Sequence, residues 1–543
     1  MSFASMFHDV ARAAPWAAGY GYGAYSSHAC HSHSIHLPDF PDLKVLSLDA
    51  TLVKDYTFIL DPFILDPEAQ VPVSVPDFCN VTVAYTHPGW HDVVTINAYL
   101  PDKEEWNGRY MANGGGGLVT GGVATEGSSM LPGLAHGYAV ATTDGGHESS
   151  LSGYAPTDVP WALSSPGNVN WPLLVDFSSV ALHDMAVVGK ALVRAYYGER
   201  AARSYFYGGS TGGRQGHMLA QRYPEDFDGV VATMPAMNWA RFLWTNLWPT
   251  FVMDQLGFYP RPCELNAITE AAIAACDPLD GVRDGIVSRM DLCKFDPHDL
   301  VGEKFDCSGT PSKFSEGAAV VAKAAWEGPR SSTGEWQWYG FSPSANISQL
   351  GIGAATTQCD TNGGNCRPIR FQISESWARY WVKKNPDFSM EGISHEVWDE
   401  LIRASVNEYT SIIGTEDPDL TGLRKSGNKL LSWHGVDDQA IPVNGTADYY
   451  DRVLARDPQA SEYYRFFVSP GSLHCTACGM LPHVMDVMEV MVDWVEKGIA
   501  PDTLPAKGTN RNGVELTRNI CMYPRVQHYV GGDIEDPSSF KCV

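Results

Sequence analysis

The chain has 543 residues, of which 44% are hydrophobic and 19% are charged, so it can bury a substantial core. Its formal net charge of −25 opposes binding to nucleic acid and to anionic membrane surfaces, and we expect neither as a partner. No segment approaches the ~20 consecutive apolar residues that a transmembrane helix needs. The length predicts two domains, or one large domain with an insertion.

The first half of the chain shows patterns that are typical of buried strands and of an amphipathic helix. Residues 94–101 (VTINAYLP) and 137–147 (GYAVATTDGGH) are short apolar runs with β-branched residues, which predicts two buried strands. Residues 176–198 place apolar side chains on one face of a helix, and Gly198 is a suitable C-cap. We expect a further strand over 203–208, followed by a tight turn and a helix that reaches about Tyr223.

The second half begins with a different kind of sequence. The region from about Trp239 to Leu420 is rich in Trp, Pro, Gly and Asn and shows no regular alternation of strands and helices, so we interpret it as an inserted lid. Residues 429–442 and 463–475 restore the pattern of a strand followed by a loop. We therefore expect three segments: a first part of the core over 1–239, a lid over 240–420, and a second part of the core over 421–543.

Twelve cysteines indicate an oxidising compartment. The chain has no pair of CxxC motifs of the kind that binds structural zinc, and its single CxxC motif, at Cys475 and Cys478, is not by itself a metal or redox site. Three N-glycosylation sequons, at Asn80, Asn346 and Asn444, agree with a secreted glycoprotein. Residues 1–30 show no clear signal sequence, so either a signal has been removed or the protein stays inside the cell.

The turn after strand 203–208 has the sequence Gly208-Gly209-Ser210-Thr211-Gly212, which matches G-x-S-x-G. Glycines on both sides of a serine permit a strained turn that lifts its hydroxyl off the end of a strand. A glycine-rich turn can also carry a serine by chance, and the pentapeptide alone does not decide between a nucleophile and a structural residue.

The residues that follow the strands predicted within 429–442 and 463–475 favour the interpretation of Ser210 as a nucleophile. A catalytic serine needs a base and a carboxylate that orients the base, and Asp438 and His474 follow Ser210 in the order of α/β-hydrolases. Alone, Asp438 could be a solvated turn carboxylate and His474 a loop histidine. His434 is the nearest rival for the base, although we expect a structural role for it.

An oxyanion intermediate also needs hydrogen-bond donors. The backbone N–H of Thr211, at the start of the predicted helix, is one candidate. The glycine run 113–122 (NGGGGLVTGG) is expected to supply the other from Gly115 or Gly116. This run lacks the lysine of a P-loop and the GxGxxG spacing, so a phosphate site is the weaker interpretation.

A second cluster of functional residues lies in CDPLDGVRDGIVSRMDLC, residues 276–293. Three aspartates separated by glycines in one short loop can surround a hard cation, although the loop lacks the EF-hand pattern. The alternative is a solvated acidic turn. The candidate ligands are the side chains of Asp277, Asp280 and Asp284 and the backbone carbonyls of Val282 and Ile286.

Six stretches follow one another along the chain: LPDKEEWNGRYMANGGGGLVTGG, HGYAVATTDGGH, GGSTGGRQGHMLAQRYPEDFDGVVATMPAMNW, CDPLDGVRDGIV, LSWHGVDDQAIP and VSPGSLHC. In sequence and order they resemble the tannase and feruloyl esterase family of secreted serine hydrolases. The resemblance covers most of the chain. The resemblance implies that Ser210 is the nucleophile, Asp438 the orienting carboxylate and His474 the base. It also implies that the loop at 277–286 binds a structural Ca²⁺ and that the lid forms much of the acyl pocket.

The resemblance also implies a set of disulfides and shows one departure. The family has a cysteine directly before the nucleophile that pairs with the one after the catalytic histidine, but here the first of these positions is Gly209. Cys263–Cys307 is our guess for two further residues, and Cys475 and Cys478 either bond to each other or stay free. The pairs implied by the family are Cys30–Cys79, Cys276–Cys293, Cys359–Cys366 and Cys521–Cys542.

We therefore predict an α/β-hydrolase core with a large lid, acting as a carboxylic ester hydrolase on small esters of aromatic acids such as hydroxycinnamic or gallic acid. The departure at Gly209 leaves a tailoring enzyme for aromatic natural products as an alternative, working by acyl transfer or a non-hydrolytic step. A catalytically inactive binding protein is a second alternative, which an intact Ser, Asp and His set opposes. The sequence does not indicate the oligomeric state.

Overall fold

The centre of the computed structural model is a nine-stranded sheet with the order β1-β4-β5-β7-β6-β10-β11-β16-β17. The structure describes residues 30–59, 72–122, 129–147, 158–360, 364–474, 482–511 and 513–543. Neighbouring strands in the part β1-β4-β5-β7 pair antiparallel. Neighbouring strands in the part β7-β6-β10-β11-β16-β17 pair in parallel. The strands are β1 (Lys44–Val53), β4 (Phe78–Thr86), β5 (Val94–Pro101), β6 (Arg109–Asn113), β7 (Ala139–Thr143), β10 (Arg203–Gly209), β11 (Gly229–Thr233), β16 (Lys429–Gly435) and β17 (Tyr464–Ser469).

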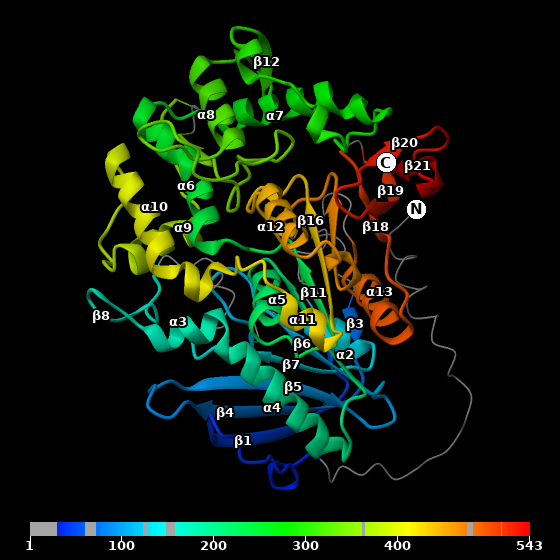
Figure 1. Ribbon diagram of the computed structural model, residues 1–543. Coiled ribbons are helices and arrows are strands. Elements are labelled where there is room, and N and C mark those ends of the chain that lie inside the picture. Colours follow the sequence, from blue (N-terminus) through cyan, green and yellow to red (C-terminus); the bar gives the residue numbers. More distant parts are fainter. Residues whose placement is uncertain are drawn as a thin grey trace.

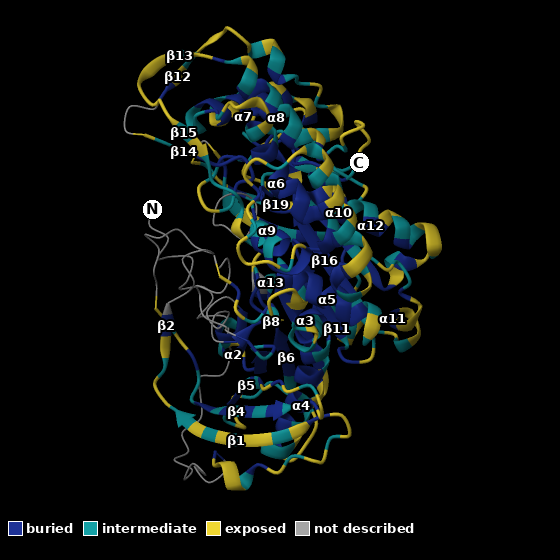
Figure 2. Ribbon diagram, turned by 90° about the vertical axis from the view of Figure 1, so that its left-hand side faces the viewer, coloured by how far each residue is buried: buried dark blue, intermediate teal, exposed yellow. Residues whose placement is uncertain are grey.

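The burial of the strands follows their place in the sheet. The central strands β7 and β11 are buried along their whole length, as continuous apolar runs require when both faces of the sheet are covered. The edge strand β1 is largely exposed (Figure 2). The strands predicted over 94–101 and 137–147 are β5 and the shorter β7, so both predictions are confirmed.

Two hydrophobic clusters cover the two faces of the sheet. Neighbouring residues of β10 alternate between them, since Phe206 belongs to one cluster and Tyr205 and Tyr207 to the other. The first cluster contains α4 (Val180–Tyr197), α5 (Thr211–Arg222) and α12 (Val443–Arg456). The second contains α2 (Leu131–Ala135), α13 (Val484–Lys497) and the hairpin of β18 (Thr503–Thr509) and β19 (Glu515–Cys521).

The single helix predicted over 176–198 is wrong at its start. The chain forms α3 (Trp171–Ser178) and α4, which are bent by 60° relative to each other. The bend lies at Ser179, whose φ of −159° is incompatible with a helix. Gly198 caps α4 in the left-handed conformation, as predicted. No single described helix is long and apolar enough to cross a membrane, and the bent α3–α4 pair passes that test by length and composition only.

The region between β11 and β16 is mainly helical, although its composition suggested irregular structure. Figure 1 shows that α7 and α8 lie at the opposite end of the molecule from β1 and β4. Other helices of this region, α6, η8 and α10, pack against α3 around five buried tryptophans: Trp239, Trp244, Trp377, Trp381 and Trp398. The elements are α6 (Trp239–Leu256), α7 (Pro262–Cys276), α8 (Glu316–Glu327), α9 (Gln372–Ser376), η8 (Trp377–Val382), α10 (His395–Tyr409), η9 (Thr410–Gly414) and α11 (Thr421–Ser426).

Small two-stranded sheets complete the structure. They are β2 (Thr57–Ile59) with β3 (Pro72–Ser74), β8 (Leu163–Ser165) with β9 (Asn168–Val169), β12 (Lys304–Cys307) with β13 (Thr310–Lys313), β14 (Thr357–Cys359) with β15 (Cys366–Pro368), and β20 (Gln527–Tyr529) with β21 (Phe540–Cys542).

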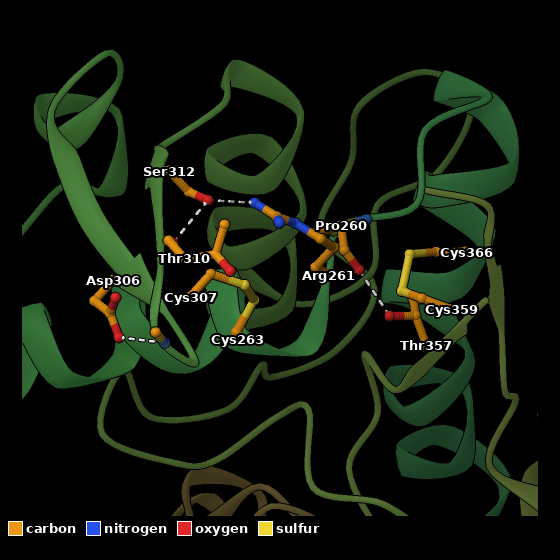
Figure 3. Close-up of a disulfide and its surroundings, with 11 residues drawn as sticks. Pro260, Arg261, Cys263, Asp306, Cys307, Thr310, Ser312, Thr357, Cys359 and Cys366 are labelled. Carbon is orange, nitrogen blue, oxygen red and sulfur yellow. Dashed lines mark hydrogen bonds between the residues drawn. A yellow bond between two sulfur atoms is a disulfide. The ribbon is translucent and has the colours of Figure 1, made fainter. Parts of the chain in front are cut away.

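Five disulfides join described residues. All four pairs implied by the family resemblance are present, together with the guessed pair Cys263–Cys307. Figure 3 shows how this pair ties the start of α7 to β12. The segment before α7 is held further by the guanidinium of Arg261, which donates to Ser312 Oγ at 2.9 Å. Cys475 and Cys478 lie outside the described residues.

Candidate active site

Ser210 occupies a strained turn between β10 and α5. Its backbone has φ 58° and ψ −121°, a conformation that non-glycine residues rarely adopt. The turn is held by the Ser210 N–H, which donates to Thr233 O at 3.0 Å. A Cβ atom on Gly208 would lie 2.6 Å from the carbonyl carbon of Gly212, so the glycine allows strand and helix to approach closely.

The three predicted catalytic side chains meet at this turn. His474 Nε2 lies 3.0 Å from Ser210 Oγ, and His474 Nδ1 lies 2.7 Å from Asp438 Oδ2. Asp438 is 1% exposed and His474 is 7% exposed. The arrangement lets the imidazole accept the serine proton while the carboxylate holds it in the required tautomer.

Asp438 remains ionised although it is buried. Burial alone would raise its pKa, but the charge of His474 and the hydrogen bonds from His434 and His474 bring the pKa well below its usual range. Its second oxygen, Oδ1, accepts the backbone N–H groups of Ala440 at 2.8 Å and Ile441 at 2.7 Å. The carboxylate is therefore fixed in orientation as well as in charge.

His434 lies on the other side of Asp438. Its Nε2 is 3.0 Å from Asp438 Oδ2, and the Thr446 hydroxyl is 2.9 Å from its Nδ1. The side chain is fully buried. His434 thus contacts the carboxylate and not the serine, in agreement with the structural role expected for it.

The neighbouring carboxylate, Asp437, points away from the triad. It accepts a hydrogen bond from Ser344, in the region between β11 and β16, and lies 3.9 Å from the guanidinium of Arg511. Burial raises its pKa. Of the two adjacent aspartates, only Asp438 contacts a histidine among the described residues.

The geometry revises the prediction for the oxyanion donors. The Gly115 N–H donates to the side chain of Gln215 at 3.0 Å, and the Gly116 N–H donates to Val119 O at 3.2 Å, so neither is free for an oxyanion. Thr211 N–H starts α5 and has no acceptor within the described part of the chain. Its hydroxyl donates to Gly117 O at 2.6 Å, which brings Gly117 beside the serine turn.

Gln215 is a functional candidate that the sequence analysis missed. It is fully buried in α5, where its Oε1 accepts from Gly115 N and its Nε2 donates to Thr120 O at 2.9 Å. It thereby holds the glycine run 113–122 against α5, the helix that directly follows Ser210. In the sequence, Gln215 is marked only by its position shortly after the serine turn, and such a position does not by itself indicate a function.

The candidate calcium loop is compact and buried. Asp277 accepts the N–H groups of Asp284 and Gly285, and Asp280 accepts that of Val282. The disulfide between Cys276 and Cys293 closes the loop. The exposed fractions of Asp277, Asp280 and Asp284 are 8%, 1% and 2%.

One cation already contacts this loop. The guanidinium of Arg518, itself 1% exposed, lies 2.9 Å from Asp284 Oδ2. Within the described chain, neither Asp277 nor Asp280 forms an ion pair, and the carbonyl oxygens of Val282 and Ile286 accept no hydrogen bond. Among the described residues, Asp277 and Asp280 are therefore buried carboxylates with no cation at ion-pair distance, and the two carbonyl groups accept no hydrogen bond.

Comparison with known proteins identifies the family. A family model described as "Tannase and feruloyl esterase" matches residues 79–543. The chain belongs to this family. It is 39% identical to a probable feruloyl esterase of Arthroderma benhamiae, covering 95% of this chain and 94% of the relative. It is 30% identical to a tannase of Aspergillus oryzae, covering 86% of this chain and 85% of the relative.

Solved structures of the tannase and feruloyl esterase family agree with the fold. The tannin acyl hydrolase of Aspergillus niger superposes with a TM-score of 0.82 at 26% identity, covering 95% of both chains. Feruloyl esterase B of Aspergillus oryzae superposes with a TM-score of 0.74 at 25% identity, covering 93% of this chain and 98% of that one. The protein is thus an α/β-hydrolase and a carboxylic ester hydrolase of the tannase and feruloyl esterase type.

The departure at Gly209 has a local physical consequence in this family member. A Cβ atom added to Gly209 would lie 2.8 Å from Thr233 Oγ1, so a cysteine there requires the threonine side chain to move. Thr233 is fully buried in β11. The partner position, Cys475, lies outside the described residues.

Proposed function

We propose that this esterase hydrolyses esters of aromatic carboxylic acids through an acyl-enzyme on Ser210. The observation that supports it most is the continuous hydrogen-bonded series from Ser210 Oγ through His474 to Asp438. The fold holds both ends of this series. The strained turn positions the serine, and the two N–H groups that follow the aspartate position its carboxylate.

The reaction would proceed in two halves. Ser210 Oγ attacks the ester carbonyl while His474 Nε2 takes its proton, and the N–H of Thr211 donates to the oxyanion. His474 then returns the proton to the leaving alcohol as the C–O bond breaks. In the second half, His474 removes a proton from water as the water attacks the acyl carbonyl, and returns it to Ser210 Oγ as the acyl C–Oγ bond breaks and the acid leaves.

The aromatic nature of the acid rests on two supports. The relatives named above are a feruloyl esterase and tannin-hydrolysing enzymes, whose names refer to aromatic acyl esters. In addition, the tryptophan-rich cluster of the lid packs against Ala440 and Ile441, whose N–H groups hold Asp438. Aromatic side chains in the same cluster as these two residues favour a planar acyl group.

We also propose that the loop at 277–286 binds a structural Ca²⁺. Buried carboxylates that form no ion pair destabilise a fold, and a hard divalent cation with oxygen ligands would balance Asp277 and Asp280. The carbonyls of Val282 and Ile286 would add neutral ligands. In this proposal the ion stabilises the loop and takes no part in ester hydrolysis. The five disulfides agree with a place outside the cell, and we include secretion in the proposal.

A fluorophosphonate probe tests the nucleophile directly, because it forms a covalent bond only with an activated serine. We expect mass spectrometry to find the label on Ser210 and to find none in Ser210→Ala. Labelling at another serine would contradict the assignment. Feruloyl, galloyl and p-nitrophenyl esters then test the acyl group, and release of free acid in water distinguishes hydrolysis from acyl transfer to an added alcohol.

A further inference from the structure

A second group of buried ionisable side chains lies where β4 and β5 meet α3 and α4. His87 directly follows β4, Asp92 precedes β5, Asp176 belongs to α3 and Asp184 belongs to α4. Their exposed fractions are 6%, 4%, 0% and 5%. One ligand atom each from His87, Asp92 and Asp176 can be chosen so that all three lie within 4.8 Å of one another. In the part of the chain that the structure describes, no other three His, Cys, Asp or Glu side chains meet in this way.

Asp176 is buried in this cluster without a hydrogen bond. Among the described residues, neither of its carboxylate oxygens has a hydrogen-bond partner, although both are fully buried. Its Oδ1 lies 3.9 Å from His87 Nδ1. Within the described residues, no lysine or arginine pairs with Asp92, Asp176 or Asp184. A buried carboxylate costs several kcal/mol when it is unpaired, so this arrangement points to a missing positive ligand.

The ring of His87 is oriented as in metal-binding histidines. Its Nε2 lies 3.0 Å from Asp184 Oδ2, which also accepts the Tyr85 hydroxyl at 2.9 Å. A carboxylate on one ring nitrogen holds the proton there and leaves the lone pair of the other nitrogen for a metal. That other nitrogen, Nδ1, forms a hydrogen bond of 2.5 Å with Asp92 Oδ2 and lies 3.9 Å from Asp176 Oδ1, so a metal bound there would replace the proton between Nδ1 and Asp92.

We propose that His87 Nδ1, Asp92 and Asp176 bind one zinc ion. Ligand atoms about 2.0–2.2 Å from a tetrahedral zinc lie ~3.4 Å apart, and the two distances from His87 Nδ1, 2.5 Å and 3.9 Å, lie on either side of this value. The imidazole favours a transition metal over calcium, which takes oxygen ligands. A divalent charge would balance the two ligating carboxylates.

The ion would join two parts of the fold. It would attach the β4–β5 connection to the end of α3, directly before the bend at Ser179. The residues after Asp176 are themselves linked to the nucleophile helix, because the fully buried Arg214 donates to the carbonyls of Phe177 at 3.0 Å and Ser178 at 2.9 Å. We therefore assign the site a structural role in positioning α3 against α5.

The test uses the full-length, disulfide-bonded chain, stripped of metal with a chelator and returned to excess calcium so that the loop at 277–286 does not compete. Zinc is then titrated by calorimetry, and metal content is measured after removal of free zinc. We expect one zinc per chain, a higher melting temperature with zinc, and an X-ray absorption spectrum with one imidazole nitrogen among oxygen ligands. Uptake of no zinc by the parent chain would overturn the proposal.

Three variants locate the ion. Asp176→Asn and His87→Gln should each weaken zinc binding at least ~10-fold, because even loss of an outer-sphere partner has an effect of this size. His183→Gln is the matched control, since His183 forms a similar pair with Asp226 at 2.8 Å outside the cluster, and it should bind zinc like the parent. If Asp176→Asn does not fold, His87→Gln decides. Equal zinc affinity of His87→Gln and the parent would show that His87 is instead a protonated partner of its carboxylates.

Discussion

His434 and His474 contact the same oxygen of one carboxylate. His474 Nδ1 lies 2.7 Å from Asp438 Oδ2, and His434 Nε2 lies 3.0 Å from it. The two imidazoles therefore share the negative charge of Asp438, and the basicity of the catalytic histidine depends on a residue that does not touch the serine.

His434→Leu should change the pH dependence of hydrolysis. Without the hydrogen bond from His434, the carboxylate of Asp438 interacts more strongly with His474. This stronger interaction raises the pKa of His474 and moves the acid limb of the kcat/KM profile to higher pH. We expect kcat to fall ~10-fold, because a hydrogen bond to a charged group contributes about 1.5–3 kcal/mol. His434→Gln can still donate to Asp438 and should restore much of the parent profile. A merely structural role would lower activity at every pH without moving the limb.

Ser210→Ala should remove ester hydrolysis while the fold persists. The variant loses the atom that becomes acylated, and we expect kcat to fall at least ~10³-fold. The melting temperature should stay close to that of the parent, because the backbone of the turn and its hydrogen bond from Ser210 N–H to Thr233 O do not need the hydroxyl. Hydrolysis within tenfold of the parent would refute the triad.

Gln215→Leu should lower kcat with little change in KM. It leaves the N–H of Gly115 and the carbonyl of Thr120 buried without partners, which costs about 1–3 kcal/mol for each group. The glycine loop beside the serine turn then shifts, and we expect kcat to fall ~10–100-fold. Gln221→Leu is the matched control, since Gln221 lies in the same helix and donates to Tyr449 at 2.9 Å instead. Equal losses in both variants would argue for a general effect on the helix.

Removal of calcium should lower the melting temperature of the esterase. Three carboxylates at 277–284 are buried in one loop, and only Asp284 forms an ion pair with a cation of the described chain. Asp280→Asn should bind calcium more weakly, and chelator should then change its melting temperature less than that of the parent. The residual kcat of folded enzyme in chelator should match the parent, because the ion has no part in the chemistry. An unchanged parent melting curve in chelator would count against the site.

The stability of the fold should decrease between pH 6.5 and about pH 4 because of His217. Burial lowers the pKa of this histidine from 6.5 to about 4. In that range the unfolded chain binds the proton and the folded chain does not, so the free energy of unfolding falls as the pH falls, by about 3 kcal/mol in total. His217→Gln should flatten the dependence in this range. His36→Gln, at an exposed position, should leave it unchanged, and parallel curves for all three proteins would contradict the assignment.

The features that could be predicted from sequence depend on neighbouring residues. The strand, the G-x-S-x-G turn and the helix after it form one local unit, since glycines beside Ser210 permit the strained backbone that the structure shows. Asp438 and His474 could be proposed because each follows an apolar strand, and parallel strands bring their carboxyl ends to one edge of the sheet. The ends of β5 and the cap at Gly198 follow from the same local chemistry.

The remaining features depend on contacts between residues far apart in the chain. The periodicity over 176–198 does not reveal the bend at Ser179, because the apolar face continues across it while the backbone turns to meet the lid. The role of Gln215 depends on Gly115, 100 residues away. His87 and Asp184 lie 97 residues apart and meet only when the sheet and helices pack. Polar groups that burial removes from water are stable only with hydrogen-bond or ionic partners in the protein. The local sequence does not show which distant residues the fold brings within reach.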